Sequence, residues 1–267
     1  MSKKSKLAES KDLILYLSKN DFKTKYAGSY MGIIWAFIQP IVTIVLYWFV
    51  FQVGLRSGDV GDTPFILWLM AGLIPWFFFQ EALVNATNCF VEYSYLVKKV
   101  VFNINILPIV KVISSLFVHV FFMGLLIIAY ILMGYFPGII AIQLVYYSFC
   151  MIMLVLSISY FTSALSVFFK DTVQIISVFM QIGTWMTPIL WNFEDPRFQD
   201  ALSNLSIIFK LNPMFYIVDG CRGTMIYGYK FYEKPMLTLY FWSFVIIMGL
   251  ISRFVYKRLK PHFADSL

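Results

Sequence analysis

Residues 112–169 form one long run without Asp, Glu, Lys or Arg. A helix that crosses a bilayer needs about 20 predominantly apolar residues, so this run is too long for one crossing and suits two. The sequence Gly134-Tyr135-Phe136-Pro137-Gly138 lies within it, and proline and glycine are the residues that end helices. We therefore expect two membrane spans joined by a tight turn at residues 134–138.

Four further apolar segments have the length of a span, and together they predict an all-α polytopic membrane protein with six transmembrane helices. The composition agrees, because 60% of the residues are hydrophobic, 13% are charged and the mean hydropathy is +0.77. A soluble domain has about 25% charged residues. A soluble enzyme, a disordered chain and a disulfide scaffold are therefore excluded. The four segments are residues 32–55, 65–89, 173–191 and 235–252.

The distribution of Lys and Arg predicts the orientation. Fifteen of the 21 lie before the first span, between spans two and three, between spans four and five, or after span six. Loops on the cytoplasmic side carry the excess of basic residues, so we expect both termini in the cytoplasm. The net charge of +7 then reflects loop charge and does not indicate nucleic acid.

Two cytoplasmic segments have the character of helices outside the spans. Residues 10–26 predict an interfacial helix, and the alternative is a solvated basic arm. Its apolar face is incomplete, because Leu13 and Leu17 lie off it. Residues 90–111 predict either a short helix docked on a partner or an extension of a spanning helix. The expected face of the first helix consists of Ile14, Leu15, Ser18, Phe22 and Tyr26, with Ser10 as its N-cap.

The segment between spans five and six, residues 192–234, includes two apolar stretches at 201–209 and 213–218. Each is too short to cross a membrane. We expect re-entrant or interfacial helices on the outside, and a small cap without a gating role is the alternative.

The sequence has no pattern of a catalytic or metal site. His, Cys and carboxylates do not cluster at ligand spacing, and the glycines at 223 and 228 are not followed by the lysine of a phosphate-binding loop. Glu81 lies late in span two, where a carboxylate is costly. It is protonated, paired, near a polar path, or hydrogen-bonded to a neighbouring helix. We interpret His119 as a donor in helix packing.

Several motifs, in order along nearly the whole chain, resemble the ABC transporter permeases that export polysaccharides. The family commonly has a proline near Asn103, and this sequence departs from it there. The motifs are Lys25-Tyr26-Ala27-Gly28-Ser29-Tyr30-Met31-Gly32-Ile33-Ile34-Trp35 with Pro40, Ala71-Gly72-Leu73-Ile74-Pro75-Trp76-Phe77-Phe78-Phe79, Leu96-Val97-Lys98-Lys99-Val100 with Leu107-Pro108, Phe168-Phe169-Lys170-Asp171-Thr172, Thr187-Pro188-Ile189-Leu190-Trp191, and Leu211-Asn212-Pro213 with Asp219 and Arg222.

Within this family, Tyr47-Trp48-Phe49-Val50-Phe51 with Gly54 and Arg56 is most similar to permeases that export wall teichoic acid. The resemblance implies a non-enzymatic homodimer in the bacterial cell membrane, joined by two ATPase subunits that bind ATP and Mg²⁺, with no cofactor in this chain. It implies a substrate linked to undecaprenyl diphosphate. Permeases for O-antigen, capsule or a drug are the nearest alternatives. One transmembrane domain would cover residues 1–267, divided into a cytoplasmic arm (1–31), a membrane region (32–255) and a tail (256–267).

Three groups of residues are candidates for function. Lys23 and Lys25 precede span one, where they would attract substrate phosphates, although inside lysines are also expected from topology alone. The path along spans one and five would be lined by Trp35, Tyr47, Phe51, Met186 and Trp191. The alternative for the aromatic rings is an interfacial belt or helix packing. The coupling to the ATPase would use Tyr95, Leu96, Lys98, Lys99 and Val100. A membrane-embedded transferase and a stand-alone channel or secondary carrier are the competing classes.

Overall fold

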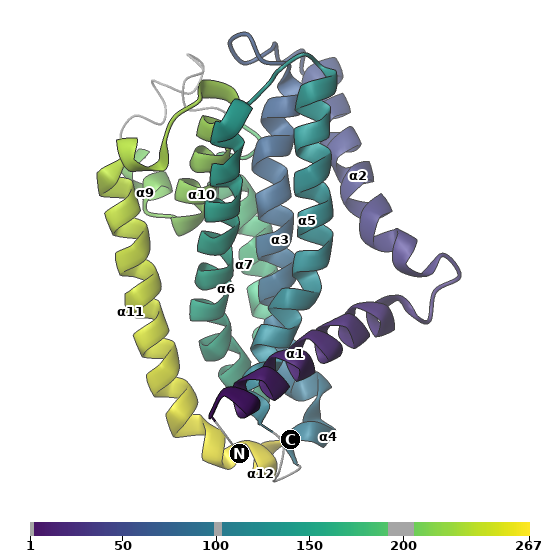
Figure 1. The fold of residues 1–267 in the computed structure, drawn as a ribbon, viewed down its shortest axis with the longest axis vertical. Coiled ribbons are helices and arrows are strands. Elements are labelled where there is room, and N and C mark those ends of the chain that lie inside the picture. The colour runs from purple at the N-terminus through teal and green to yellow at the C-terminus, as the bar shows by residue number, and fades with distance from the viewer. Residues whose placement is uncertain (1–2, 99–102, 192–205) are drawn as a thin grey trace.

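The computed structural model describes residues 3–98, 103–191 and 206–267. Among these residues, five helical segments are long and apolar enough to cross a membrane, arranged as a bundle (Figure 1). Each consists of one main α-helix, extended in most cases by a short 3-10 or π turn. They are η1 (Gly32–Ile34) with α2 (Trp35–Trp48) and η2 (Phe49–Gly54), α3 (Phe65–Glu92), η3 (Ile104–Ile106) with α5 (Leu107–Leu132), η4 (Gly138–Ile142) with α6 (Gln143–Phe168), and α11 (Pro235–Leu259) with η8 (Lys260–His262).

The expected fifth span is shorter in the structure than the sequence suggested. Helix α7 (Thr172–Met186) has 15 residues, which at about 1.5 Å per residue is less than the thickness of a bilayer core of about 30 Å. The helix ends where Thr187 takes an extended conformation (φ −90°, ψ 134°). Pro188 disfavours the helical conformation of the residue before it. A crossing by the α7 segment, which would bring the number of spans to six, stays a prediction.

Helix α3 is the centre of the bundle and packs against α5, α6, α7 and α10 (Pro213–Arg222). Its residues are apolar on every side, which is typical of a buried helix. Leu67, Leu73 and Ala82 are fully buried in it. In contrast, α2 and α11 lie at the periphery, and few of their side chains are buried. Such faces suit lipid or a further protein subunit.

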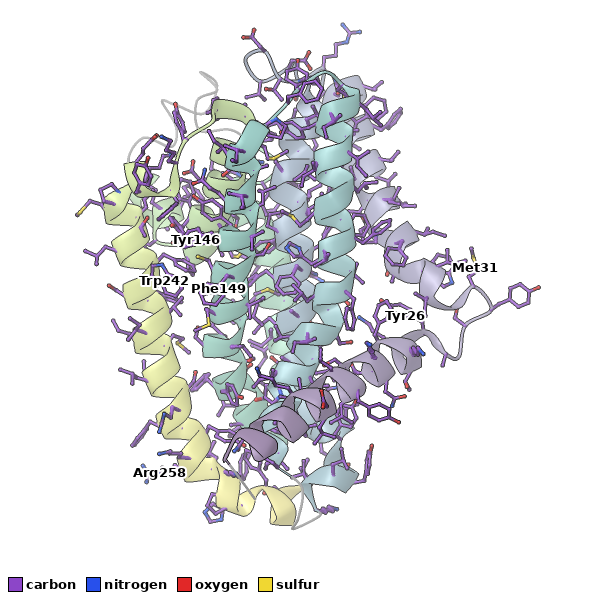
Figure 2. The ribbon with its side chains drawn as sticks, in the orientation of Figure 1. Tyr26, Met31, Tyr146, Phe149, Trp242 and Arg258 are labelled. Atoms are coloured by element: carbon purple, nitrogen blue, oxygen red, sulfur yellow. The ribbon has the colours of Figure 1, made fainter. Side chains whose placement is uncertain are left out.

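Helices α5 and α6 are joined by the expected turn between Leu132 and Gly138. Gly134 and Gly138 have positive φ angles of 86° and 61°, which glycine adopts without a steric penalty. Helix α6 then packs along α11. The indole of Trp242 donates a hydrogen bond to the hydroxyl of Tyr146 at 3.1 Å, and both side chains lie between these two helices (Figure 2).

Helix α1 (Lys3–Tyr26) lies obliquely across α5, toward the end of the bundle that also holds α4 (Ser94–Val97) and α12 (Phe263–Ser266) (Figure 1). Its packed face matches the expected one at Ile14, Ser18, Phe22 and Tyr26, which are buried or half-buried, but it is slightly rotated. Leu17 and Asp21 turn toward the bundle, whereas Leu15 is 47% exposed. The partners on α5 decide this rotation, because a polar pair described below positions Asp21 inward.

The opposite end of the bundle holds α9 (Ser206–Lys210), α10, η6 (Gly223–Tyr227) and η7 (Phe231–Glu233). Asn212 caps α10 by accepting a hydrogen bond from the amide of Met214 at 3.0 Å. Almost every side chain of α10 is buried among α3, α6 and α11. This packing is compatible with a re-entrant helix. The expected stretch at 201–209 lies partly outside the described residues.

Candidate functional site

A cavity of about 510 Å³ opens between the end of α1 and helices α2, α3 and α7. It lies between the segments expected as spans one and five and the central helix α3. The wall consists of amide and hydroxyl side chains, one ion pair and several aromatic rings. The lining residues are Lys25, Tyr26, Ala36, Gln39, Pro40, Thr43, Tyr47, Leu73, Trp76, Phe77, Gln80, Glu81, Gln181, Thr184 and Trp185.

The chemistry of this lining is unusual for helices of such apolar composition. Gln39, Gln80 and Gln181 each offer an amide with two donors and an acceptor, and they come from three different helices. The cavity can therefore form hydrogen bonds with a polar chain while its rings contact the apolar faces of that chain.

The α7 wall of the cavity is held close to α3. A Cβ atom on Gly183 would lie 2.7 Å from the indole ring of Trp76. Only glycine permits this approach without displacing the ring. The sequence offered no sign of this contact, because the two residues are more than 100 positions apart.

Glu81 is paired with Lys25. The ammonium of Lys25 lies 2.5 Å from the carboxylate, and the two side chains are 35% and 28% exposed. Burial favours a lower pKa for Lys25, but the adjacent Glu81 carboxylate outweighs this and raises the pKa above its ordinary value. The pair joins the end of α1 to α3, and a partly exposed pair of this kind is worth about 1 kcal/mol or less.

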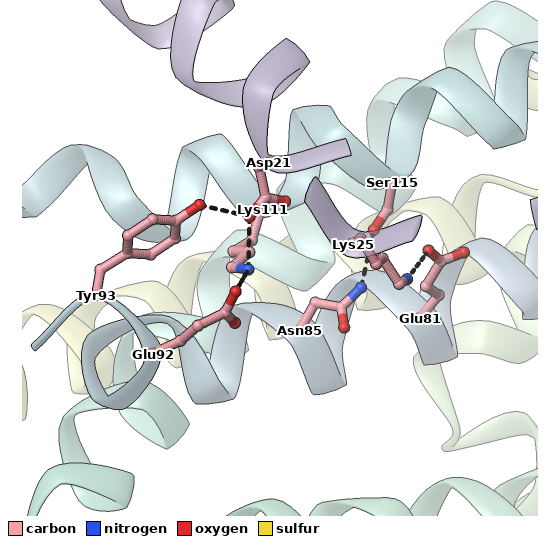
Figure 3. A network of polar contacts seen from close by, with 8 residues as sticks. All are labelled: Asp21, Lys25, Glu81, Asn85, Glu92, Tyr93, Lys111 and Ser115. Carbon is pink, nitrogen blue, oxygen red and sulfur yellow. Dashed lines mark hydrogen bonds and ion pairs between the residues drawn. The ribbon is translucent and has the colours of Figure 1, made fainter. Parts of the chain in front are cut away.

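A second polar network is buried, and it fixes α1 on the bundle (Figure 3). The ammonium of Lys111 lies 2.6 Å from Asp21 and 2.7 Å from Glu92, and Lys111 and Asp21 are 7% and 6% exposed. The hydroxyl of Tyr93 donates to Asp21 at 2.6 Å. Burial and this hydrogen bond raise the pKa of Tyr93 well above its ordinary range, so the hydroxyl stays protonated. The sequence indicated Lys111 only as one of the basic residues of a cytoplasmic loop.

The guanidinium of Arg222 binds the chain that follows α7. This side chain is 7% exposed and donates hydrogen bonds to the carbonyls of Pro188 and Ile189, the latter at 2.7 Å. It also lies over the ring of Trp68, with its central carbon 3.5 Å from the ring centroid. A Cβ atom on Gly72 would clash with the guanidinium at 2.6 Å. Arg222 thus satisfies carbonyl groups that the end of α7 leaves without helical partners.

The predicted path residues divide between the cavity and other places. Lys25 and Tyr47 line it, whereas Lys23 is exposed and does not. The remaining side chains lie outside the lining: Trp35 is 43% and Met186 42% exposed, the Phe51 ring packs against Tyr47 and Phe65, and Trp191 donates to the carbonyl of Trp185 at 3.0 Å. Composition could not give the helix rotation that decides these positions.

The predicted coupling segment forms a separate short helix, α4, after α3 has continued to Glu92. Tyr95 is 58% exposed, Lys98 is exposed and Leu96 is half-buried. Lys99 and Val100 lie outside the described residues. The helix is anchored by its own buried residue Val97, which belongs to the same core cluster as Phe90, Leu107 and Phe263.

His119 packs inside the bundle. Its Nε2 atom lies 3.0 Å from the hydroxyl of Ser148, and its ring contacts Phe78. The arrangement agrees with a helix-packing role. Among the residues that the structure covers, no group of three His, Cys, Asp or Glu could hold a metal ion.

Comparison with known proteins identifies the family. The profile of the family described as "ABC-2 type transporter" matches residues 12–226. The chain belongs to the ABC-2 type transporter family. ABC-2 membrane subunits are components of transporters and not catalysts, and this one is a multi-pass membrane protein.

Relatives of this ABC-2 protein match over nearly their whole lengths. It is 24% identical to the O-antigen export system permease protein RfbA of Myxococcus xanthus over 98% of this chain and 97% of the relative. Two proteins of the same name from Klebsiella pneumoniae are 25% and 27% identical, each over 96% of this chain and 95% of the relative.

Proposed function

We propose that this chain is the membrane subunit of an ATP-driven exporter that moves a lipid-linked polysaccharide of the O-antigen type from the cytoplasm to the outer face of a bacterial membrane. The support is the family, whose members normally pair with an ABC ATPase, and the printed names of the full-length relatives. ATP and Mg²⁺ would bind in that partner and not in this chain.

The cavity between α2 and α7 carries the proposal. Its amides and hydroxyls suit the hydroxyl groups of a sugar chain, and rings such as Tyr47 and Trp185 can stack on sugar faces. The cavity lies on the side of the bundle where α2 and α7 expose apolar residues. A second copy packed on this side would enclose it, which is the basis for proposing a homodimer.

The charge of the lining favours a neutral polysaccharide over teichoic acid. Lys25 is the one Lys or Arg among the lining residues, and its ammonium is paired with Glu81. A polymer with a phosphate on every unit would need cations that are not already neutralised. Teichoic acid stays the second candidate, because the segment from Tyr47 to Arg56 resembles the permeases that export it.

The functional test is reconstitution with the ATPase partner in proteoliposomes. A neutral polysaccharide and a poly(glycerol phosphate), each on undecaprenyl diphosphate, are supplied from the cytoplasmic side, and appearance on the other side is measured. We expect ATP-dependent export of the neutral polymer. Export of the phosphate polymer alone would reverse the assignment, and equal transport without the ATPase would indicate a secondary carrier.

A matched pair of variants tests the cavity itself. Gln181→Leu removes an amide of the lining, whereas Gln174→Leu removes an exposed amide on the same helix outside the cavity. We expect the first variant to slow export about tenfold, since about 1.4 kcal/mol from lost hydrogen bonds corresponds to that factor, and the second to export normally. Equal rates in both variants would remove the cavity from the path.

A further inference from the structure

A second large cavity lies on a different side of the molecule, in a groove of about 660 Å³ between α6 and α11. It shares no residue with the cavity between α2 and α7. Its upper walls are apolar, and they include Met153 and Leu156 of α6 with Trp242, Ile246 and Leu250 of α11. At its lower end the lining changes to basic and amide side chains.

Three cations line this lower end along one side of α11 and η8. They are Arg253, Lys257 and Lys260, which at spacings of four and three residues share a helix face. Lys260 donates to the side-chain oxygen of Asn105 at 3.0 Å, and the hydroxyl of Tyr256 donates to the same oxygen at 2.7 Å. Within the described part of the chain, Arg253 and Lys257 have no hydrogen-bond or ion-pair partner.

The length of the apolar part matches one leaflet of a bilayer. From Trp242 to Arg253 the helix rises about 16 Å at about 1.5 Å per residue, and half of a hydrocarbon core is about 15 Å. The basic end therefore lies at the level of the lipid headgroups when the apolar part is within the acyl chains. Unpaired cations beside an acyl-sized groove fit an anion that carries a hydrocarbon chain, and basic pockets between membrane helices bind such headgroups.

We propose that the α6–α11 groove is a binding site for one anionic glycerophospholipid. An acyl chain lies along Ile246, Gly249 and Leu250, and the phosphate is bound by Arg253 and Lys257, with Lys260 held beside it by Asn105. The site does not depend on which polymer the transporter moves. It gives α11, of which few residues are buried, a specific lipid partner on its path along the bundle.

The test is native mass spectrometry of the full-length protein titrated with phosphatidylglycerol or with phosphatidylcholine of the same acyl chains. We expect one phosphatidylglycerol per chain, bound at least about tenfold more tightly than phosphatidylcholine. Arg253→Gln with Lys257→Gln should abolish this preference, since each cation near the headgroups adds about 1 kcal/mol, which makes about 30-fold for two. Equal binding of the two lipids by the unmodified protein would overturn the proposal.

A charge-matched control separates the groove from general surface charge. Lys170→Gln with Arg258→Gln also removes two positive charges, but from exposed positions that do not line the groove. Arg258 lies at the lower end of α11 (Figure 2). We expect its lipid preference to stay within about twofold of the unmodified protein. A loss equal to that of the groove variant would assign the effect to net charge and overturn the proposal.

Filling the acyl part of the groove is an independent arm that leaves all charges in place. The Cβ of a residue at Gly249 would have ordinary van der Waals contact with Ser157, at 3.9 Å, so Gly249→Leu fits the helix and occupies the groove. We expect it to weaken phosphatidylglycerol binding about tenfold. Inorganic phosphate should not compete, and displacement by an equal concentration of undecaprenyl phosphate would show that the groove serves the carrier lipid instead.

Discussion

Single side chains determine how the peripheral helices attach to the central one. Lys111 holds Asp21 and Glu92 in one network, and Arg222 closes the broken end of α7. Both cations are nearly inaccessible to solvent, so their partners decide whether they stabilise the fold. Removing one member of a buried pair costs about 3–5 kcal/mol, while replacing the whole pair by apolar residues is often neutral.

The Asp21–Lys111 pair gives a clear stability prediction. Lys111→Met leaves the Asp21 carboxylate buried without its cation and should lower the free energy of unfolding by about 3 kcal/mol. Asp21→Leu combined with Lys111→Met should recover most of this loss, because no buried charge then remains unpaired. Thermal unfolding of the detergent-solubilised protein measures both. A double variant as unstable as the single one would contradict this account.

The planar fork of Arg222 should not be replaceable by lysine. Arg222→Lys keeps the charge but loses the two-pronged contact with the carbonyls of Pro188 and Ile189 and the stacking on Trp68, so we expect a loss of about 2 kcal/mol in unfolding free energy. Arg258→Lys, on the exposed face of α11, is the matched control and should leave the unfolding temperature unchanged. Equal stability of both variants would show that a point charge suffices at position 222.

Elements are predictable from this sequence to different degrees. The bilayer thickness fixes the length of an apolar run, so residues 65–89 and 235–252 located α3 and α11 to within a few residues at most ends. The end of α7 has a local signal in Pro188, but the contact of Arg222 with the chain after Met186 was not predictable, because Arg222 lies at a distant position. The face of α1 was predicted apart from Leu15, and the inward turn of Asp21 was missed, since its partner Lys111 lies on another helix. In α3, apolar residues on all sides leave no signal of rotation.

Helix α4 gives a prediction about coupling at the scale of elements. Tyr95 and Lys98 are exposed at the end of the bundle where α1 and α12 lie, whereas the neighbouring Val97 anchors the helix. Tyr95→Ala with Lys98→Ala should therefore keep the fold and reduce ATP turnover by the assembled transporter about tenfold. The measurement is ATPase activity at equal complex concentration. Unchanged turnover and export would place the coupling outside this helix.

For the whole molecule, the exposed apolar side formed by α2 and α7 predicts self-association. The native Cys89, Cys150 and Cys221 are buried. A crosslink between two copies can therefore be assigned to a cysteine introduced on this exposed side. Ile182→Cys on α7 should form an intermolecular crosslink in membranes, and Ile247→Cys on the exposed side of α11 should not. Gel electrophoresis under non-reducing conditions checks this. Crosslinks only through α11 would move the dimer interface to the other side.

The two helices that form the walls of the α2–α7 cavity are not attached equally tightly to the rest of the bundle. Helices α2 and α7 each bury only two residues, so the difference lies in their local contacts. Gly183 of α7 lies against Trp76 of α3, and Arg222 binds the chain after α7. Beside α2, the end of α1 is joined to α3 by a partly exposed ion pair. We therefore expect α7 to be the fixed wall of the cavity and α2 to be the movable one. Passage of a bulky cargo would then displace α2 first and leave α7 standing with the centre of the bundle.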